Sequence, residues 1–367
     1  MPPENKKQAE PGKTLLVTGG AGFIGSHLVR RALALGHQVV NLDKLTYASN
    51  LAGLADLAAA PGYRFVQGDV ADRACVRTLI ADTQPDFVFH LAAESHVDRS
   101  IDDPAAFVTT NLVGTFEMLE AAFAAWSRYD EAKKTGFRFI HVSTDEVFGA
   151  LGPTGVFDET TSYDPSSPYS ASKAGSDHLA RAWHRTYGLP VTVTNCSNNY
   201  GPFQHAEKFI PTVIRSALAG GKIPVYGTGQ NVRDWIFVED HVEGLLKAAE
   251  AGTPGETYLF GGGSERCNDD LCRLICNLLD ELQPCTSGKA YADRISHVED
   301  RPSHDFRYAI DSSSTRKALG WKAGTSLEEG LRATVRWYLA HPEAFMRDEG
   351  ELARLGLARS SAVVETA

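Results

Sequence analysis

Long hydrophobic runs and an excess of positive charge are both missing from this sequence. None of its apolar stretches approaches the roughly 18 residues of a membrane span, and the opening segment MPPENKKQAEPGK lacks the apolar centre of a signal peptide. We therefore expect a cytoplasmic protein with no membrane partner. With 36 Lys and Arg residues against 46 Asp and Glu residues, the formal net charge is −10. That balance argues against nucleic acid as a partner, because polyanions bind basic surfaces.

Cysteine is scarce and irregularly spaced. The six Cys residues form no disulfide framework and no CxxC pair, so we expect reduced thiols and no metal site. Four of them lie between Cys267 and Cys285, and the role of this group stays open. Within it, Cys272 and Cys276 are four residues apart among large apolar residues, which predicts buried positions on one face of a helix.

Hydrophobic residues make up 43% of the 367 positions, which permits a large core divided between about two domains. Apolar runs of strand length alternate with helical patterns, as in proteins built from βαβ units. The predicted strands cover residues 14–18, 38–43, 63–67, 86–91, 137–142 and 190–195. We therefore predict the α/β class, with a doubly wound parallel sheet of the Rossmann type and a second, smaller α/β domain that binds substrate.

The alternation loosens beyond Asn195. Segments 235–240 (WIFVED) and 257–263 (TYLFGGG) predict later strands by which the chain returns to the first sheet. We expect the sheet domain to cover residues 13–200 and to be revisited at about 233–262, with an interrupted second domain over 201–342. Residues 1–12 and 351–367 are expected to be flexible tails. A final helix is predicted from Ser326, because Ser326 and Glu329 fit a capping box.

A glycine-rich turn, TGGAGFIG, follows the first predicted strand and opens a predicted helix that stops at Gly36. It contains Gly20, Gly22 and Gly25 in GxGxxG register, with Gly19 in front. Glycine suits this position because the turn is tight, the backbone must approach a pyrophosphate, and the helix N-terminus offers free N–H groups to that anion. An isolated match is often a turn without a ligand, but the strand before it and the helix after it favour a dinucleotide site.

Asp43 ends the second predicted strand, where the dinucleotide motif expects an acid that binds the ribose hydroxyls. A carboxylate at this place would repel the 2′-phosphate of NADP. The predicted cofactor is therefore NAD, although the adjacent Lys44 would attract the 2′-phosphate of NADP.

Tyr169 and Lys173 form a YxxxK pair, whose spacing places both side chains on one face of a helix. A nearby ammonium stabilises a phenolate, which lowers the pKa of the tyrosine and makes it usable as a base. Tyr129 and Lys133 have the same spacing, but they precede the strand predicted at 137–142. Because ligands of open α/β sheets bind beyond the carboxyl ends of the strands, we favour Tyr169 and Lys173.

Two successive carboxylates follow the same strand. The segment STDE places Ser143, Thr144, Asp145 and Glu146 at its carboxyl end. Two acids whose environments separate their pKa values can divide the roles of proton donor and acceptor. The alternative is a solvated acidic turn, and the neighbouring YxxxK pair and dinucleotide motif favour catalysis.

These motifs together resemble the extended short-chain dehydrogenases and, among them, the dTDP-glucose 4,6-dehydratases. The resemblance covers roughly residues 13–340 and rests on the segments DKLTYASN (43–50), HLAAESHVDRSI (90–101), STDEVFG (143–149), SSPYSASK (166–173), NCSNNYGP (195–202), RDWIFVEDH (233–241) and RPSHDFRYAID (301–311). It implies a bound nucleotide sugar that is oxidised at C4 as hydride passes to NAD, loses water across C5 and C6, and is reduced at C6 when hydride returns.

The resemblance also implies residue roles. Tyr169 would take the proton of the sugar 4-hydroxyl, with Thr144 bonded to that oxygen and Lys173 beside it. Glu146 would remove the C5 proton while Asp145 protonates the departing 6-hydroxyl. The implied NAD-binding residues are Gly19, Gly22, Phe23, Ile24, Gly25, Asp43, Lys44, Asp69, Val70, Leu91, Ala92, Ala93, Tyr169, Lys173 and Asn195. The implied nucleotide-sugar residues are Ser95, His96, Thr144, Asn199, Lys208, Arg233, Asn268, Arg301 and His304. Asn268 is a weaker candidate within this set, and Tyr308 is a weaker candidate outside it.

Two details of the substrate side stay open. A lone histidine more often satisfies a structural hydrogen bond, so the role of His96 is not assigned. In LFGGGSERCNDD, Cys267 precedes Asn268 and a third glycine is present, which departs from the family pattern and leaves the contact to the base unsettled.

The resemblance further implies a homodimer, with helices over 104–126 and 168–187 at the interface, although their apolar faces suit the core of a monomer equally well. Other functions also fit parts of the pattern. A UDP-glucose 4,6-dehydratase shares most of it, a nucleotide-sugar 4-epimerase has no need of the acid pair, and a noncatalytic NAD-sensing protein would be expected to lose the catalytic side chains. The nucleotide base and the pathway that uses the product, rhamnose or another deoxysugar, stay open.

Overall fold

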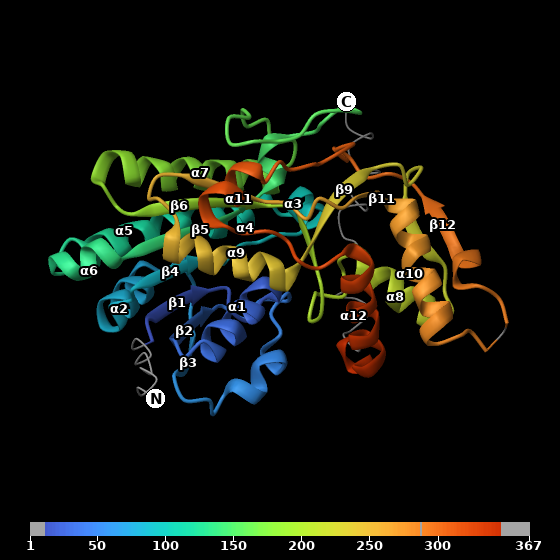
Figure 1. The fold of residues 1–367 in the computed structure, drawn as a ribbon, viewed down its shortest axis with the longest axis horizontal. Helices are drawn as coiled ribbons and strands as arrows, with labels where there is room; N and C mark the ends of the chain where they lie inside the picture. The colour runs from blue at the N-terminus through green and yellow to red at the C-terminus, as the bar shows by residue number, and fades with distance from the viewer. Residues whose placement is uncertain (1–11, 287, 346–367) are drawn as a thin grey trace, which may run out of the picture.

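The computed structural model describes residues 12–286 and 288–345 (Figure 1). Of the predicted tails, 351–367 and all of 1–12 except Gly12 lie outside the described residues. Among the described helices, none combines the length and apolar character needed to cross a bilayer.

Seven parallel strands form the central sheet, in the order β10-β6-β5-β4-β1-β2-β3. Their bounds are β1 (Thr14–Thr18), β2 (Gln38–Asp43), β3 (Tyr63–Gln67), β4 (Phe87–His90), β5 (Arg138–Thr144), β6 (Val191–Cys196) and β10 (Thr257–Phe260). The first three coincide with the predicted ranges, because strands covered on both faces are nearly continuous apolar runs. The strand order reverses between β1 and β4, and such a reversal opens a crevice beyond the carboxyl ends.

Helices cover both faces of this sheet, which confirms the doubly wound α/β prediction. Figure 1 shows α7 on one side of the sheet and α9 on the other. One layer contains α1 (Phe23–Ala34) and α9 (Val238–Ala251), and the other contains α2 (Arg73–Thr83), α5 (Gly114–Trp126) and α7 (Pro168–Tyr187). The helix predicted over 168–187 is α7, whereas the one predicted over 104–126 is divided into α4 (Pro104–Phe107), the π-helical turn η2 (Val108–Val113) and α5.

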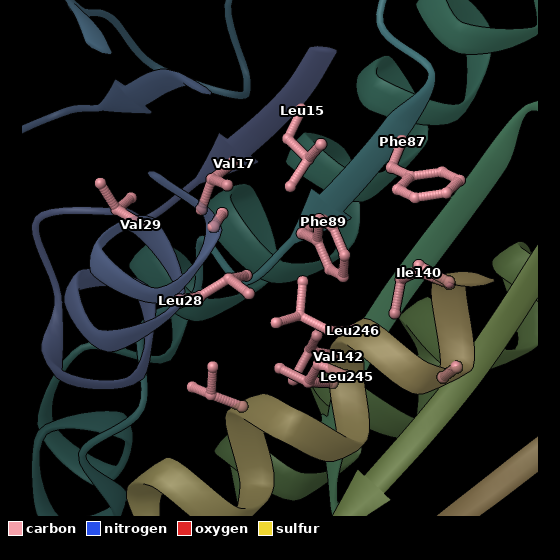
Figure 2. Close-up of a cluster of buried hydrophobic side chains, with 14 of the residues drawn as sticks. Leu15, Val17, Leu28, Val29, Phe87, Phe89, Ile140, Val142, Leu245 and Leu246 are labelled. Atoms are coloured by element: carbon pink, nitrogen blue, oxygen red, sulfur yellow. The ribbon is translucent and has the colours of Figure 1, made fainter. Parts of the chain in front are cut away.

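The core beneath α1 and α9 is largely apolar. Figure 2 shows side chains of β1, β4 and β5 facing those of the two helices, among them Leu15, Phe89, Leu28 and Leu246. All four are buried. Each such side chain contributes roughly 1.5–3 kcal/mol when it leaves water, so this layer fixes the strand ends from which the site is built.

A second group of elements encloses its own hydrophobic core, at the right of Figure 1. Its three-stranded sheet contains β7 (Asn198–Tyr200), β9 (Val232–Phe237) and β11 (Glu265–Cys267), and its two-stranded sheet contains β8 (Ile223–Tyr226) and β12 (Ile295–Val298). The helices are α8 (Phe209–Leu218), α10 (Asn268–Leu282) and α12 (Leu327–Ala340). Cys272 and Cys276 are buried in this core, as their spacing predicts.

The prediction that both later strands rejoin the first sheet is correct for one of them. TYLF forms β10, which pairs with β6, but WIFVED contributes to β9, which pairs with β7 and β11. Trp235 and Phe237 of β9 pack in the second core. An apolar run shows that a strand is buried but not which sheet buries it, and this explains the error.

Shorter helical elements complete the described part of the chain. They are η1 (Leu51–Leu57), α3 (Val97–Asp102), α6 (Glu131–Gly136), η3 (Asp145–Phe148), η4 (Tyr291–Arg294), α11 (Ser313–Leu319) and η5 (Pro342–Phe345). The predicted capping box of α12 is present, because Ser326 Oγ accepts from Glu329 N at 3.3 Å and Glu329 Oε2 accepts from Ser326 N at 3.2 Å.

A glycine sets how closely α12 approaches β7. A Cβ added at Gly330 would overlap Tyr200 Oη and lie 2.9 Å from Tyr200 Cζ, and Tyr200 is buried in the second core. We predict that Gly330→Ala lowers the free energy of unfolding by about 1–3 kcal/mol, because an overpacked core must shift. Urea denaturation measures this. The control is Gly136→Ala, whose Cβ would meet nothing within 4 Å, and equal midpoints for the two variants would contradict the prediction.

Candidate active site

A cavity of about 300 Å³ lies at the carboxyl edge of the central sheet. It is lined by Asp43 at the end of β2, by residues 91–95 after β4, by residues 142–146 at the end of β5 and by residues 196–199 after β6. A second cavity of about 170 Å³ adjoins it toward the second core. The two share five lining residues, Ser95, Glu146, Asn198, Glu207 and Lys208, and so form one site with two parts.

The glycine-rich turn fits the phosphates of a dinucleotide. Gly19 has φ +73°, and a Cβ there would lie 2.8 Å from Ala92 N. Gly19, Gly22 and Gly25 line the cavity, whereas Gly20 packs against the Asn41 side chain, so the spacing that faces the cavity is GxxGxxG instead of the predicted GxGxxG. Gly22 is the N-cap of α1 and supplies no side-chain acceptor. The first N–H groups of α1 are therefore available to an anion.

Hydrogen bonds hold the Asp43 carboxylate in place at the far end of this cavity. Oδ2 accepts from Ala21 N at 2.9 Å, and Oδ1 accepts from Leu45 N at 2.8 Å and Ser49 Oγ at 2.9 Å. Lys44 Nζ lies 2.6 Å from Asp69 Oδ2. Because Asp69 balances the charge of Lys44, the lysine attracts a 2′-phosphate less than its position in the sequence suggests.

Of the other residues implied to bind NAD, one does not reach the cavity. Those that line it are Phe23, Ile24, Lys44, Asp69, Val70, Leu91, Ala92, Ala93, Tyr169 and Lys173. Asn195 is buried on β6, where its Nδ2 donates to Thr144 O at 2.9 Å. The expected cofactor contact of Asn195 is therefore not supported, because its amide is used to tie β6 to the end of β5.

The five candidate catalytic side chains meet in the first cavity. Thr144 Oγ1 donates to Asp145 Oδ1 and accepts from Glu146 N, both at 3.3 Å, and is hydrogen-bonded to the Tyr169 side chain. Lys173 Nζ donates to Val142 O at 2.8 Å. The end of β5 thus brings its own acids into contact with the N-terminal part of α7.

The two acids occupy different electrostatic environments. Burial raises the pKa of Asp145 well above its ordinary value, and the nearby Glu146 and Asp234 add to the rise. Burial also raises the pKa of Glu146, but Arg301, Arg233 and Lys208 oppose that change. Burial thereby favours the protonated form of Asp145, while Glu146 faces cations that stabilise its carboxylate.

The pKa of Tyr169 does not follow the YxxxK prediction. Burial and the Glu146 carboxylate raise the pKa of Tyr169 well above its ordinary value, and the hydrogen bond between Tyr169 and Thr144 opposes them. Lys173 directs its ammonium at the Val142 carbonyl. The lowered pKa of Tyr169 that the YxxxK spacing predicts is therefore not found. The spacing contains no information about the burial of Tyr169 or about the nearby Glu146 carboxylate.

The second YxxxK pair lies at the opposite edge of the sheet. Lys133 Nζ is 3.0 Å from Asp86 Oδ1, just before β4, and 5.2 Å from the ring of Tyr129. Neither Tyr129 nor Lys133 lines either cavity. Their position agrees with the argument that the pair precedes β5.

All nine residues implied to bind the nucleotide sugar line the two-part site. Thr144 and Asn199 line the first cavity, Ser95 and Lys208 line both, and the second is lined by His96, Arg233, Asn268, Arg301 and His304. Tyr308 does not line either cavity; its ring lies 4.2 Å beneath the Arg233 guanidinium and its hydroxyl donates to Asp305 Oδ2 at 2.5 Å. It supports Arg233 instead of reaching a ligand.

Sequence reasoning missed Glu207, which lines both cavities. Its Oε2 lies 3.3 Å from Arg99 Nε and 3.8 Å from His96 Nε2. Against the effect of burial, a hydrogen bond from His205 and the charges of His96 and Lys208 lower the pKa of Glu207 to about 2. The sequence contained a signal for Glu207, because this acid directly precedes Lys208, which was predicted to bind the nucleotide sugar. Within the described residues, no group of three or more His, Cys, Asp and Glu side chains is placed to hold a metal ion.

A glycine-lined helix N-terminus at the sheet crevice, a YxxxK pair and a second cavity that contains two arginines and a lysine define a nucleotide-dependent short-chain dehydrogenase type of site. The family model described as GDP-mannose 4,6 dehydratase matches residues 16–334. The chain belongs to this family and, within it, to the dTDP-glucose 4,6-dehydratases, as its relatives show.

Among these relatives is a dTDP-glucose 4,6-dehydratase of Xanthomonas campestris pv. campestris (strain B100), 55% identical over 89% of this chain and 93% of that protein. Another is the dTDP-glucose 4,6-dehydratase 1 of Escherichia coli (strain K12), 54% identical over the same shares. The crystal structure of DesIV, a dTDP-glucose 4,6-dehydratase from Streptomyces venezuelae with NAD and TYD bound, has a TM-score of 0.82 at 44% identity and covers 91% of this chain and 99% of its own. A UDP-glucose 4-epimerase from Thermotoga maritima reaches 0.79 at 28% identity, covering 90% and 99%.

The hydrogen-bonded Asp43 carboxylate leads to a prediction about cofactor choice. We expect Asp43→Asn to reduce the preference for NAD over NADP by about tenfold or more, because the repulsive charge is lost while the shape is kept. Dissociation constants of both dinucleotides, measured by calorimetry, give the ratio. Asp72→Asn removes an equal charge at the N-cap of α2, outside the cavity, and is the control. An unchanged ratio in Asp43→Asn would contradict the assignment.

Proposed function

We propose that this chain converts dTDP-glucose to dTDP-4-keto-6-deoxyglucose and water, with NAD bound throughout the cycle. The observation that carries the proposal is the pair formed by the buried Asp145 and the half-buried Glu146, which faces the same cavity as Tyr169 and Lys173. The names of the relatives at 54–55% identity support the choice of dTDP-glucose.

NAD fits the first cavity. The open N-terminus of α1 would bind its diphosphate, and Asp43 would accept hydrogen bonds from its ribose. Bound NAD supplies a hydride acceptor for the oxidation and a hydride donor for the final reduction.

Oxidation at C4 needs a base and an orienting donor. Tyr169 would take the proton of the 4-hydroxyl, and Thr144, which is already bonded to Tyr169, would hold the same oxygen. Because burial raises the pKa of Tyr169, its phenolate needs a nearby cation. Lys173, one helical turn away on α7, is placed to supply that charge.

Elimination of water needs a second base and a second acid. The 4-keto group makes the C5 proton acidic, and Glu146, whose carboxylate faces three cations, would remove it. Asp145, which burial holds protonated, would donate its proton to the departing 6-hydroxyl. Two adjacent carboxyls in unlike environments thus divide the roles of base and acid.

The second cavity suits the nucleotide diphosphate. Arg233 and Arg301 offer forked donors to phosphate oxygens, and Lys208 adds a point charge where the two cavities meet. Asp98, Glu146 and Glu207 line the same cavity, so these three cations balance local carboxylates within a chain of net charge −10.

A nucleotide-sugar 4-epimerase is the nearest alternative, since a structure of that class shares the fold. An epimerase has no elimination to catalyse, so the acid pair would have no task. Incubation with dTDP-glucose, and separately with UDP-glucose, followed by mass spectrometry distinguishes the two. Loss of one water from dTDP-glucose, faster than from UDP-glucose, supports the proposal. An unchanged mass with inverted C4 would overturn it in favour of an epimerase, and no conversion would favour an NAD-sensing protein.

We further propose a cytoplasmic homodimer in which residues 13–200 and β10 bind NAD and residues 201–342 bind the nucleotide sugar. All six cysteines are free thiols, as suits a reducing compartment. Val108, Val113 and Tyr187, on the helical segments expected at the interface, are 41–48% exposed. Light scattering in solution tests the dimer, and a mass near 39.8 kDa instead of twice that value would exclude it.

The division between acid and base predicts different defects in two isosteric variants. Glu146→Gln should abolish exchange of the C5 hydrogen with solvent, because the base is lost. Asp145→Asn should slow water loss by about a hundredfold or more while the first oxidation proceeds. Deuterium incorporation from D₂O and rapid-quench analysis of the sugar measure these steps. Glu131→Gln, on exposed α6, is the control, and full activity of both site variants would remove the assigned roles.

The elimination rate should also follow a bell-shaped pH profile. Glu146 must be ionised, so the rate should fall as the pH drops through its pKa, which lies above the ordinary 4.5. Asp145 must be protonated, so the rate should fall as the pH rises through its own raised pKa. Single-turnover measurements across pH test both limbs. A rate that stays constant on the alkaline side would contradict the role of Asp145.

A further inference from the structure

Helix α7 carries a row of alternating charges beneath the active site. Lys173, Asp177 and Arg181 are four residues apart and lie on one face of the helix. Lys173 is 4% exposed and Asp177 is fully buried. Neither Asp177 nor Arg181 lines the two cavities, and the roles proposed above use neither of them. A buried carboxylate with no contact to ligand needs another explanation.

The Asp177 carboxylate joins α7 to three neighbouring segments. His141 Nε2 on β5 donates to Oδ1 at 3.0 Å. Tyr163 Oη, in the segment before α7, donates to Oδ2 at 2.8 Å, and Asn195 Nδ2 on β6 lies 3.3 Å from the same oxygen. Asn195 also donates to Thr144 O at 2.9 Å. The carboxylate therefore fixes the backbone from which Thr144 enters the cavity.

The same carboxylate lies one helical turn from a buried ammonium. Lys173 Nζ donates to a neutral acceptor, Val142 O, at 2.8 Å. Burial lowers the pKa of Lys173, and Asp177 opposes this change more than Cys196 does. A buried ammonium without a negative charge nearby tends to lose its proton.

The charged and titratable groups around this pair leave Asp177 as the source of negative charge. Burial lowers the pKa of His90 on β4 and of His141, so both rings are neutral. Burial raises the pKa of the Cys196 thiol to about 12. Tyr163 is a neutral phenol. Arg181 Nη2 donates to Tyr163 Oη at 2.8 Å, which holds the Arg181 guanidinium one helical turn beyond Asp177. Against burial, the hydrogen bonds from His141 and Tyr163 and the charge of Lys173 hold the pKa of Asp177 below its ordinary value.

We propose that Asp177 is a positioning residue for the oxidation step: its carboxylate keeps Lys173 charged and bonded to the Val142 carbonyl, and holds α7 against β5 and β6. Lys173 can then offset the phenolate of Tyr169 in a site where burial disfavours charge. The inference rests on the proposed function in assigning Lys173 to the oxidation.

The test compares two variants in the same hydrogen-bond network. Asp177→Asn keeps the shape and an acceptor but removes the charge, whereas Tyr163→Phe removes one hydrogen bond to the carboxylate and keeps the charge. NMR of isotope-labelled lysine Cε in the holoenzyme, assigned with Lys173→Met, follows the titration of Lys173. We expect Asp177→Asn to lower the pH of that titration by about one unit or more, and Tyr163→Phe to leave it in place.

Kinetics provide the second readout. In single turnovers of Asp177→Asn, the pH above which the oxidation rate falls should decrease by the same amount as the pH of the Lys173 titration. KM for dTDP-glucose should be unchanged. Asp177→Ser, whose smaller side chain cannot clash, replaces the Asn variant if the latter does not fold. In a Lys173→Met background, loss of the Asp177 charge should cost no further activity.

Two results would overturn the inference. One is a Lys173 titration at the same pH in the wild type and in both Asp177 variants. The other is an oxidation rate that falls equally at every pH in the Asp177 variants and falls further when they are combined with Lys173→Met. Each result would mean that the Asp177 carboxylate has only a structural role. A shifted Lys173 titration in a protein that does not convert dTDP-glucose would leave the inference standing and remove the proposed function instead.

Discussion

The parallel pairing of the seven central strands is the constraint on which the site depends. Because every strand runs the same way, the segments that leave β1, β2, β4, β5 and β6 all emerge at one edge. The glycine turn at Gly19, the carboxylate of Asp43 and the acid pair after β5 are far apart in the sequence and line one cavity for this reason. Their positions are only as fixed as the apolar layers that hold the strands, such as the layer in Figure 2.

Burial at that edge determines the chemistry. A side chain that leaves water favours its neutral form, so burial raises the pKa of Asp145 and of Tyr169 and lowers the pKa of Lys173. The cations of the second cavity act in the opposite direction on Glu146 and Glu207. Acid, base and phosphate-binding roles thus arise from common side chains whose surroundings differ over a short distance.

The same fold carries more than one reaction. A 4-epimerase structure superimposes on this chain almost as well as a dehydratase structure does. Fold alone therefore does not distinguish the two. We propose that the distinction lies in the two carboxyl groups that follow β5, because an elimination needs both an acid and a base there.

The sequence alone determined the sheet strands, the glycine turn, the capping box and the list of side chains able to do chemistry. These depend on local patterns of apolar residues, glycines and spacing, and the first three strands coincide with their predicted ranges. Tertiary structure decided the rest. It placed β9 in a separate sheet, turned Asn195 and Tyr308 into supports, made Glu207 part of the site and raised the pKa of Tyr169. Each of these outcomes depends on which distant residues exclude water or supply charge, and local sequence contains no record of either.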